Sequence, residues 1–376
     1  MSFTITPRER VYGYLLVTRN PRLVAVLILA AFPAAAQENE DSAVSGLVEI
    51  SGFVDASYTY NSLHDSNTFG LDQVEIDLSR NLGDIGSLRA DLEWVSDGEG
   101  GFTLDAEQGY VTLDLGLGRD EGNYPILTFG KFNAPIGFEL LDAPDMYQYS
   151  HSLVFSRGLP TNLTGAMLAI NLSGGMDVVV HLTNGWDNNV DANSNKMFGG
   201  RLGYSHEDMG GIGFSAMRGD QEVTVLNSAV EDPVSNLTVY DIDLTLTPAP
   251  GLIIGGEYNY GKRELEIWES ETKWNGYMVM AHYSLTDVMG LTGRYDYFNT
   301  STRTVTSSAP GLIHTFESDK THQALTVAPT FALTDGLGFL MELRRDFADA
   351  AIFGDPDEGE QEKSMVNFAF EMTYSF

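Results

Sequence analysis

From Val48 to the last residue, Phe376, side chains alternate between apolar and polar with a period of two residues, almost without a break. The alternation is clear in residues 366–376, where every second residue is large and apolar. Successive side chains of a β-strand point to opposite faces, so this period indicates strands that have one apolar face. The sequence therefore predicts an all-β fold for nearly the whole chain.

Short turns and long polar connections alternate between these predicted strands. The short turns, such as Asn81–Gly86 and Thr334–Gly336, are rich in Gly, Asp and Asn. The eight long connections are Asn61–Gly70, Ser96–Thr103, Asn133–Pro160, Gly185–Lys196, Gly219–Asn236, Gly261–Lys273, Thr300–Lys320 and Phe347–Lys363.

Outer-membrane barrels have this asymmetry, with short periplasmic turns and long outer loops. A soluble β-sandwich would also alternate, but its connections need not differ in this way. We therefore expect residues 47–376 to form a transmembrane antiparallel up-and-down β-barrel of about 16 strands, two for each long connection.

Tyrosines at the predicted strand ends agree with a membrane setting. Tyr258, Tyr295 and Tyr297 lie where strands would reach the outer lipid interface, and amphipathic rings favour that level. The terminal residues Tyr374 and Phe376 resemble the C-terminal aromatic signal through which the bacterial barrel-assembly machinery recognises its clients.

Residues 1–36 have the features of a secretory signal peptide. Four arginines precede an apolar segment at 23–32, and Ala34–Ala36 supplies the small residues that a signal peptidase accepts. A transmembrane anchor is the alternative. We expect residues 37–46 to be a short periplasmic segment, and the exported protein to reside in the bacterial outer membrane.

Composition excludes several other classes. The 53 acidic and 21 basic side chains give a formal net charge of −32, which would repel nucleic acid. The absence of cysteine excludes disulfides and thiolate metal sites. No cofactor or metal is predicted. An enzyme is disfavoured, because no nucleophile motif such as G-x-S-x-G stands beside a histidine.

The connection at residues 133–160 differs from the other long connections because it contains many large apolar side chains. Such a segment is expected to fold against other parts of the protein, and a barrel of this size has an aqueous interior that could receive it. We predict an inward-folded constriction loop. A lid on the rim or on a neighbouring subunit, or a plug that closes a structural or adhesive barrel, are the alternatives.

Charged side chains on the inward faces should set the ionic preference of a pore. We expect Arg201 and Arg294 to face the acidic side chains of the constriction loop, and the excess of inward carboxylates to favour cations modestly. Acidity without selectivity is the alternative. The predicted pore-lining residues are Glu139, Asp142, Asp145, Arg89, Arg201, Arg294, Arg344, Asp296 and Glu257.

Three segments resemble a known family. Residues 129–139 read FGKFNAPIGFE, residues 184–188 read NGWDN, and residues 52–55 read GFVD. In these segments, and loosely across residues 45–376, the chain resembles the OmpL-like β-barrel porins. The resemblance implies an outer-membrane porin-like barrel and supplies no established binding residues.

Together these features predict an outer-membrane porin for passive diffusion of small hydrophilic solutes and ions. The expected partners are outer-membrane lipid and lipopolysaccharide, the barrel-assembly machinery, the permeating solutes and, as a possibility, two further copies in a homotrimer.

Overall fold

The computed structural model describes residues 48–96, 101–116, 124–191, 195–222, 234–265, 270–309, 312–354 and 361–376. The predicted signal peptide, residues 1–36, and the predicted periplasmic segment, residues 37–46, lie outside the described residues. No helix in the described ranges is long and apolar enough to cross a membrane.

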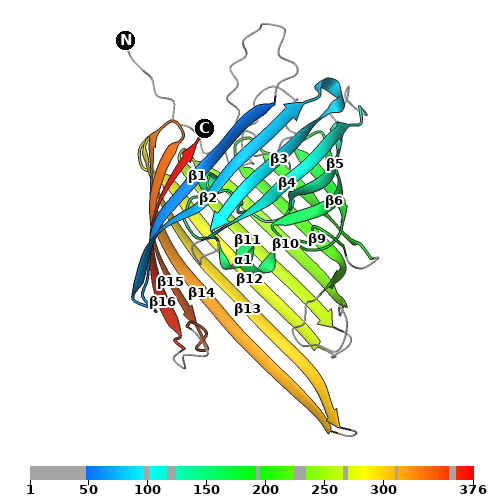
Figure 1. Cartoon of the computed structure of the whole chain (residues 1–376), viewed down its shortest axis with the longest axis vertical. Helices are drawn as coiled ribbons and strands as arrows, with labels where there is room; N and C mark the ends of the chain where they lie inside the picture. The colour runs from blue at the N-terminus through cyan, green and yellow to red at the C-terminus, as the bar shows by residue number, and fades with distance from the viewer. Residues whose placement is uncertain are drawn as a thin grey trace.

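Sixteen antiparallel strands form one closed barrel, in which each strand pairs with its neighbours in sequence (Figure 1). The prediction of an up-and-down barrel of about 16 strands is confirmed. The strands are β1 (Glu49–Asn61), β2 (Ser66–Asn81), β3 (Gly86–Ser96), β4 (Phe102–Asp114), β5 (Tyr124–Asn133), β6 (Asn162–Asn171), β7 (Met176–Thr183), β8 (Met197–His206), β9 (Gly210–Glu222), β10 (Val234–Ala249), β11 (Leu252–Leu265), β12 (Ser270–Ser284), β13 (Met289–Ala309), β14 (Leu312–Thr334), β15 (Leu337–Ala348) and β16 (Ser364–Ser375).

The first and last strands close the ring. Their register runs from Phe53 opposite Ser375 to Asn61 opposite Asn367. Beyond it, the Gly52 nitrogen lies 3.3 Å from the Phe376 oxygen, and the Phe376 nitrogen lies 3.0 Å from the Gly52 oxygen. Closure matters because lipid offers no hydrogen bonds to an open strand edge.

The outer surface of the barrel is apolar and carries a group of tyrosines. Tyr258, Tyr277 and Tyr297 are direct neighbours on β11, β12 and β13. The rings of Tyr277 and Tyr297 stack with centroids 5.0 Å apart, and Tyr295 lies 6.0 Å from Tyr277. Aromatic groups of this kind are typical of the lipid–water boundary on transmembrane barrels.

The hairpin of β13 and β14 differs from the sequence prediction. Residues 300–320 were expected to form a long polar connection, but almost all of them continue the two strands, which project beyond the rest of the barrel (Figure 1). Polar β-branched residues such as Thr300 and Thr302 favour extended backbone without needing an apolar environment. Arg303 and Glu317 add a cross-strand ion pair at 3.7 Å.

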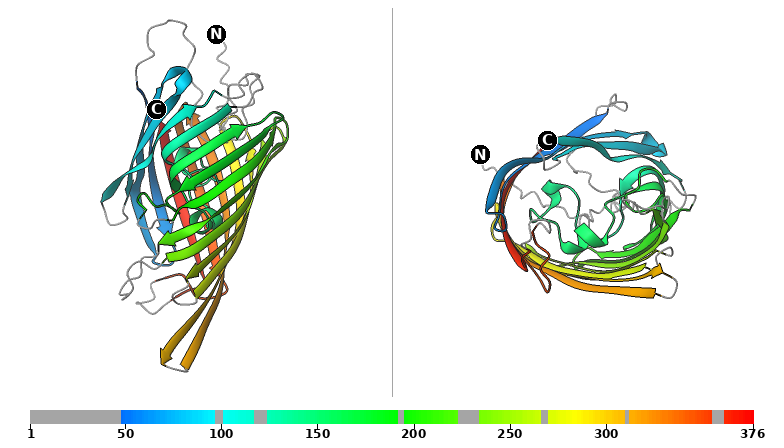
Figure 2. Two further views of the ribbon diagram at one scale, coloured as in Figure 1. Left: turned by 90° about the vertical axis from the view of Figure 1, so that its right-hand side faces the viewer. Right: turned by 60° about the horizontal axis from the view of Figure 1, so that its bottom comes forward.

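The segment between β5 and β6, residues 134–161, lies inside the ring of strands, and we call it the lumenal loop (Figure 2). It contains a short 3-10 helix, η4 (Ala143–Asp145), and one α-helix, α1 (Leu153–Gly158). The η4 turn contacts β1 and β16, whereas α1 contacts β11, β12 and β13. The loop therefore reaches opposite walls of the barrel.

One wall of the lumen is apolar, which explains why an apolar loop can dock there. Ala134 and Ile136 of the lumenal loop pack against a cluster of buried side chains that point inward from β5 to β10. The largest members of the cluster on these strands are Phe132, Leu163, Met167, Met197, Met217 and Leu237. Burial of these groups stabilises the docked loop through the hydrophobic effect.

Two glycines on strands offer a test of the wall packing. A Cβ at Gly165 on β6 would lie 2.2 Å from the Leu182 backbone oxygen, whereas a Cβ at Gly293 on β13 would meet nothing within 4 Å. We expect Gly165→Ala to destabilise the barrel by about 1–3 kcal/mol, the usual cost of overpacking. The matched Gly293→Ala variant should be neutral. Thermal unfolding of the refolded proteins, followed by circular dichroism, measures the difference; equal midpoints would contradict this packing.

Candidate functional site

The centre of the lumenal loop is held by Arg294, whose side chain is fully buried on β13. Its Nη1 donates to Glu139 Oε1 at 2.8 Å and to the Ser150 backbone oxygen at 2.7 Å. Its Nη2 donates to the His151 backbone oxygen at 3.0 Å, and its Nε donates to Asp296 on the same strand at 2.9 Å. One guanidinium thus joins two separate parts of the loop to the wall.

Arg344 on β15 holds the same part of the loop from the adjacent region of the wall. Its Nη1 donates to Ser150 Oγ at 2.9 Å and to the His151 oxygen at 2.8 Å. Asp346 accepts from Arg344 Nε at 3.0 Å, and it also lies 2.9 Å from His322 Nε2. The carboxylate orients the guanidinium toward the loop and compensates its charge.

Two carboxylates of the wall accept hydrogen bonds from the loop backbone. Glu257 Oε2 on β11 accepts from the Phe138 nitrogen at 3.0 Å, and Glu342 Oε2 on β15 accepts from the Ser150 nitrogen at 3.1 Å. Backbone groups of a loop that leaves the solvent need such partners, because an unpaired buried amide is costly. The wall therefore supplies both donors and acceptors to the loop.

Near α1, the loop is ordered by its own polar side chains. Ser152 caps α1, because its Oγ accepts from the Phe155 nitrogen at 3.1 Å. Glu139 Oε2 accepts from the Ser152 nitrogen at 2.8 Å. His151 Nε2 lies 2.9 Å from the Leu140 oxygen, and burial lowers the pKa of this imidazole. The ring is therefore kept neutral at pH 7, which avoids adding a charge beside two arginines.

Asp142 and Asp145 stand at the opposite side of the loop, around η4. Asp142 approaches Glu75 of β2 and Glu107 of β4, with one oxygen of each carboxyl group within 4.8 Å of the others. Burial, followed by the charges of Glu107 and Asp145, raises the pKa of Asp142 well above its usual value. Three carboxyl groups at this spacing share protons, so this side of the lumen is rich in acidic groups but carries fewer charges than it has carboxyl groups.

Arg89 and Arg201 form their ion pairs with carboxylates of the barrel wall and not with those of the lumenal loop. Arg89 pairs with Asp91 at 2.7 Å and with Asp77 at 3.4 Å. The expectation that Arg201 faces the acids of the loop is wrong, since Arg201 forms its ion pair with Asp243.

Arg201 reaches Asp243 because the strand between them has no side chain in the way. Arg201 on β8 and Asp243 on β10 are separated by β9, which presents Gly213 between them. A Cβ at Gly213 would lie 2.0 Å from Arg201 Nη2, so the guanidinium rests directly over this glycine.

The structure thus groups six of the nine predicted pore-lining residues around the loop: Glu139, Asp142, Asp145, Glu257, Arg294 and Arg344, while Asp296 supports Arg294. The sequence analysis missed Ser150 and His151. The His151 backbone oxygen accepts from both arginines, and Ser150 accepts from Arg294 with its backbone oxygen and from Arg344 with its hydroxyl oxygen. The available signal was the polar run Ser150–Ser152, which lies between the aromatic Tyr149 and the apolar Leu153.

Residues 47–376 match the family described as "Putative beta-barrel porin-2, OmpL-like". The chain belongs to this family. Family membership, together with the 16-stranded barrel, identifies a porin-type outer-membrane β-barrel and favours a channel over an enzyme. No curated protein matches the sequence.

Solved structures confirm the fold class. A loop-deletion mutant of OmpT, an outer membrane protein of Vibrio cholerae, is 12% identical with a TM-score of 0.60, over 88% of this chain and all of that chain. An anion-selective porin from Comamonas acidovorans is 13% identical with a TM-score of 0.59, over 88% and 99%. The channel DcaP of Acinetobacter baumannii is 11% identical with a TM-score of 0.54, over 88% and 97%. At such identities the likeness concerns the fold alone.

Adjacent arginines on β15 provide a test of the loop anchor. Arg344 points inward to the loop, whereas Arg345 is exposed on the other face of the strand. We expect Arg344→Gln to speed hydrogen exchange of residues 139–152 at least tenfold, because it removes two charged hydrogen bonds that oppose local opening. Arg345→Gln should leave exchange unchanged. Mass-spectrometric exchange measures both, and equal protection in the two variants would contradict the anchor.

Proposed function

We propose that this barrel is an outer-membrane porin through which small hydrophilic solutes and ions diffuse passively, with a modest preference for cations. The lumenal loop narrows the passage between the η4 side and the α1 side of the lumen. Export by the predicted signal peptide at residues 1–36 would deliver the chain to the periplasm for assembly.

The charge of the interior carries the proposal. Four arginines are buried inside the barrel, among the described residues, and no lysine is. Against them stand twelve buried acids: Asp55, Glu75, Asp91, Glu107, Asp177, Asp241, Asp243, Glu257, Asp296, Glu342, Asp346 and Glu371. A confined lumen in which ionised carboxylates outnumber guanidiniums raises the local concentration of cations and repels anions.

A closed barrel is the second candidate. The contacts of the lumenal loop with opposite walls, and the complete burial of the Arg294 side chain, favour a segment that fills the lumen. Such a barrel would serve a structural or adhesive role. The two candidates differ in one observable, since only a porin conducts ions in the absence of other proteins.

Several partners belong to the same proposal. The apolar outer face would contact outer-membrane lipid and lipopolysaccharide. Tyr374 and Phe376, exposed at the end of β16, would present the signal for the barrel-assembly machinery. A homotrimer is a further proposal; a trimer form is recorded for OmpT of Vibrio cholerae.

Planar-bilayer recording of the refolded protein tests the function. In a salt gradient we expect steady single-channel steps and a reversal potential of the sign that cation preference gives. In recordings at pH 9, Asp55→Asn should lower the cation-to-anion permeability ratio about twofold, because a unit charge about 8 Å from an ion contributes roughly 0.5 kcal/mol in water. Asp55 Oδ1 has no hydrogen-bond partner among the described residues, so the structural cost of this change is small.

Asp335→Asn is the matched control, because Asp335 is exposed in the short turn between β14 and β15, outside the strands that line the lumen. It should leave the reversal potential unchanged. An anion-selective current would contradict the charge argument, and a folded barrel without any current would favour the closed alternative.

A further inference from the structure

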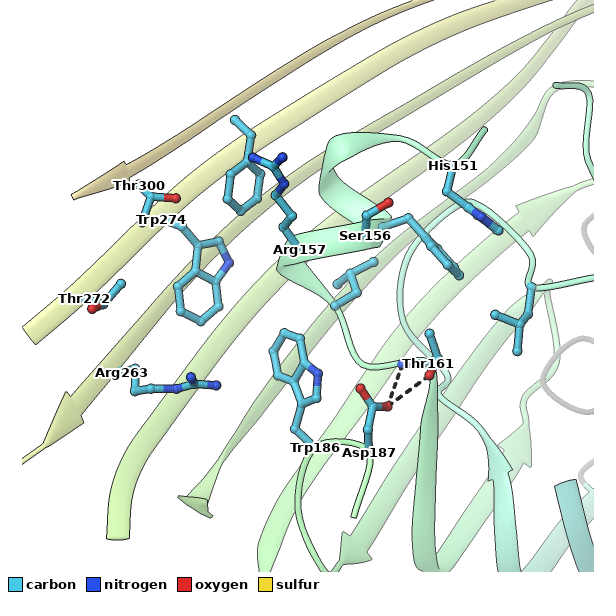
Figure 3. A pocket seen from close by; sticks show the side chains of 14 residues that line it. His151, Ser156, Arg157, Thr161, Trp186, Asp187, Arg263, Thr272, Trp274 and Thr300 are labelled. Carbon is cyan, nitrogen blue, oxygen red and sulfur yellow. Dashed lines mark hydrogen bonds between the residues drawn. The ribbon is translucent and has the colours of Figure 1, made fainter. Parts of the chain in front are cut away.

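A cavity of about 570 Å³ lies between the lumenal loop, the strands β11 to β13 and the connection after β7 (Figure 3). Its position is on the α1 side of the loop, away from the acidic cluster around Asp142. The volume is in the range of pockets that bind small organic molecules. It lies near the end of the barrel where the long connections are found.

Two arginines line this cavity, and neither has a partner among the described residues. Arg157 projects from α1, and Arg263 comes from the end of β11 (Figure 3). Neither guanidinium forms a hydrogen bond or an ion pair with any residue of the described ranges, and the Nε of Arg263 is buried. By contrast, the four inward arginines of the barrel wall, Arg89, Arg201, Arg294 and Arg344, all form ion pairs.

Arg157 is exposed and Arg263 is half-buried, so both guanidiniums are open to a ligand that enters the cavity. A guanidinium is a preferred partner for the carboxylate of such a ligand. Asp346, the acid whose charge acts on Arg157, is already bonded to Arg344 and His322. Within the described part of the chain, both guanidiniums are therefore available to an anionic ligand.

Aromatic rings form the rest of the cavity wall. Trp186 and Trp274 meet edge to face with centroids 6.2 Å apart, and Phe155 and Phe298 complete the surface. Trp274 is fixed, because its Nε1 donates to Asn259 Oδ1 at 2.8 Å. Rigid rings in these positions present an apolar surface on which a planar group can stack.

Asp187 is the carboxylate that lines the cavity, and it has a structural task. Its Oδ1 accepts from the Thr161 nitrogen at 2.8 Å, the Thr161 hydroxyl at 3.1 Å and the Asn162 nitrogen at 2.9 Å (Figure 3). The backbone at Asp187 has a φ of 55°, which belongs to a tight turn. Asp187 thus joins the connection after β7 to the end of the lumenal loop, and it does not pair with Arg157 or Arg263.

We propose that the cavity binds a small anion that carries an aromatic ring, with the carboxylate paired to Arg263, the ring against the tryptophans, and Arg157 adding positive charge from the α1 side (Figure 3). This names a solute class and rests on the proposed porin function, since the cavity would lie on the diffusion path. A neutral sugar would use the rings but leave both guanidiniums uncompensated. A metal cation would be repelled by them.

Isothermal titration of the refolded full-length barrel with benzoate tests the proposal without relying on conductance. We expect saturable binding of benzoate that is at least tenfold tighter than that of benzyl alcohol, which lacks the charge, or of acetate, which lacks the ring. Arg263→Gln should weaken benzoate binding about tenfold or more, whereas Arg157→Gln, which removes a charge but no direct partner of the carboxylate, should weaken it about twofold. Arg263→Lys should lose less, because it keeps the charge.

Arg303→Gln is the matched control, because Arg303 is exposed on β13 outside the cavity and pairs with Glu317. It should bind benzoate as the wild type does, and circular dichroism verifies that each variant is folded. Absent benzoate binding in a barrel that conducts would overturn this inference alone. Binding without conductance would overturn the porin function instead. Maltose binding that is indifferent to the arginine changes would assign the cavity to sugars.

Discussion

Two buried guanidiniums, those of Arg294 and Arg344, determine how the inside of this barrel is organised. A buried charge without a partner is strongly destabilising, so each arginine requires acceptors within reach. The wall supplies Asp296 and Asp346, and the lumenal loop supplies Glu139 and the backbone oxygens of Ser150 and His151. The docked loop therefore supplies the hydrogen-bond acceptors that the two wall arginines need in addition to Asp296 and Asp346.

This arrangement divides the lumen into two regions of different chemistry. Around η4, Asp142 joins the carboxyl groups of Glu75 and Glu107, while around α1 the cavity holds Arg157 and Arg263 with aromatic rings. Only a closed barrel can keep both regions, because ring closure leaves every strand paired and the interior isolated from lipid. A general preference for cations and a local site for an organic anion can thus coexist in one passage.

Much of the fold could be predicted from the sequence, because the two features that define it, the alternation within strands and the lengths of the connections, are local. Alternation with a period of two fixes which face of a strand meets lipid, and the length of each connection fixes the strand count. The long β13–β14 hairpin was not predicted. Its outer part contains polar residues such as Thr300 and Thr302, which do not alternate with apolar residues and so do not show the pattern of a strand.

The site was predicted in part for a different reason. Alternation along the strands predicts that Arg294 and Arg344 point inward. Which carboxylate each arginine pairs with depends on which strands lie side by side and on small residues between them. Arg201 reaches Asp243 across Gly213, a contact that spacing along the chain does not contain. Arg157 and Arg263 were missed because one lies on a helix of the loop and the other at a strand end, and only the folded loop brings them together.

The docked position of the loop can be tested by cross-linking, and the absence of native cysteine makes the test clean. Val154 Cγ2 of α1 lies 3.0 Å from the place of a Cβ on Gly276 of β12. This is close enough for a disulfide between cysteines at the two positions. The account predicts rapid oxidation of Val154→Cys with Gly276→Cys, detected by mass spectrometry of unreduced peptides, and none for Val154→Cys with Gly293→Cys. Failure of the first pair to form a disulfide in the folded barrel would contradict a loop held inside the lumen.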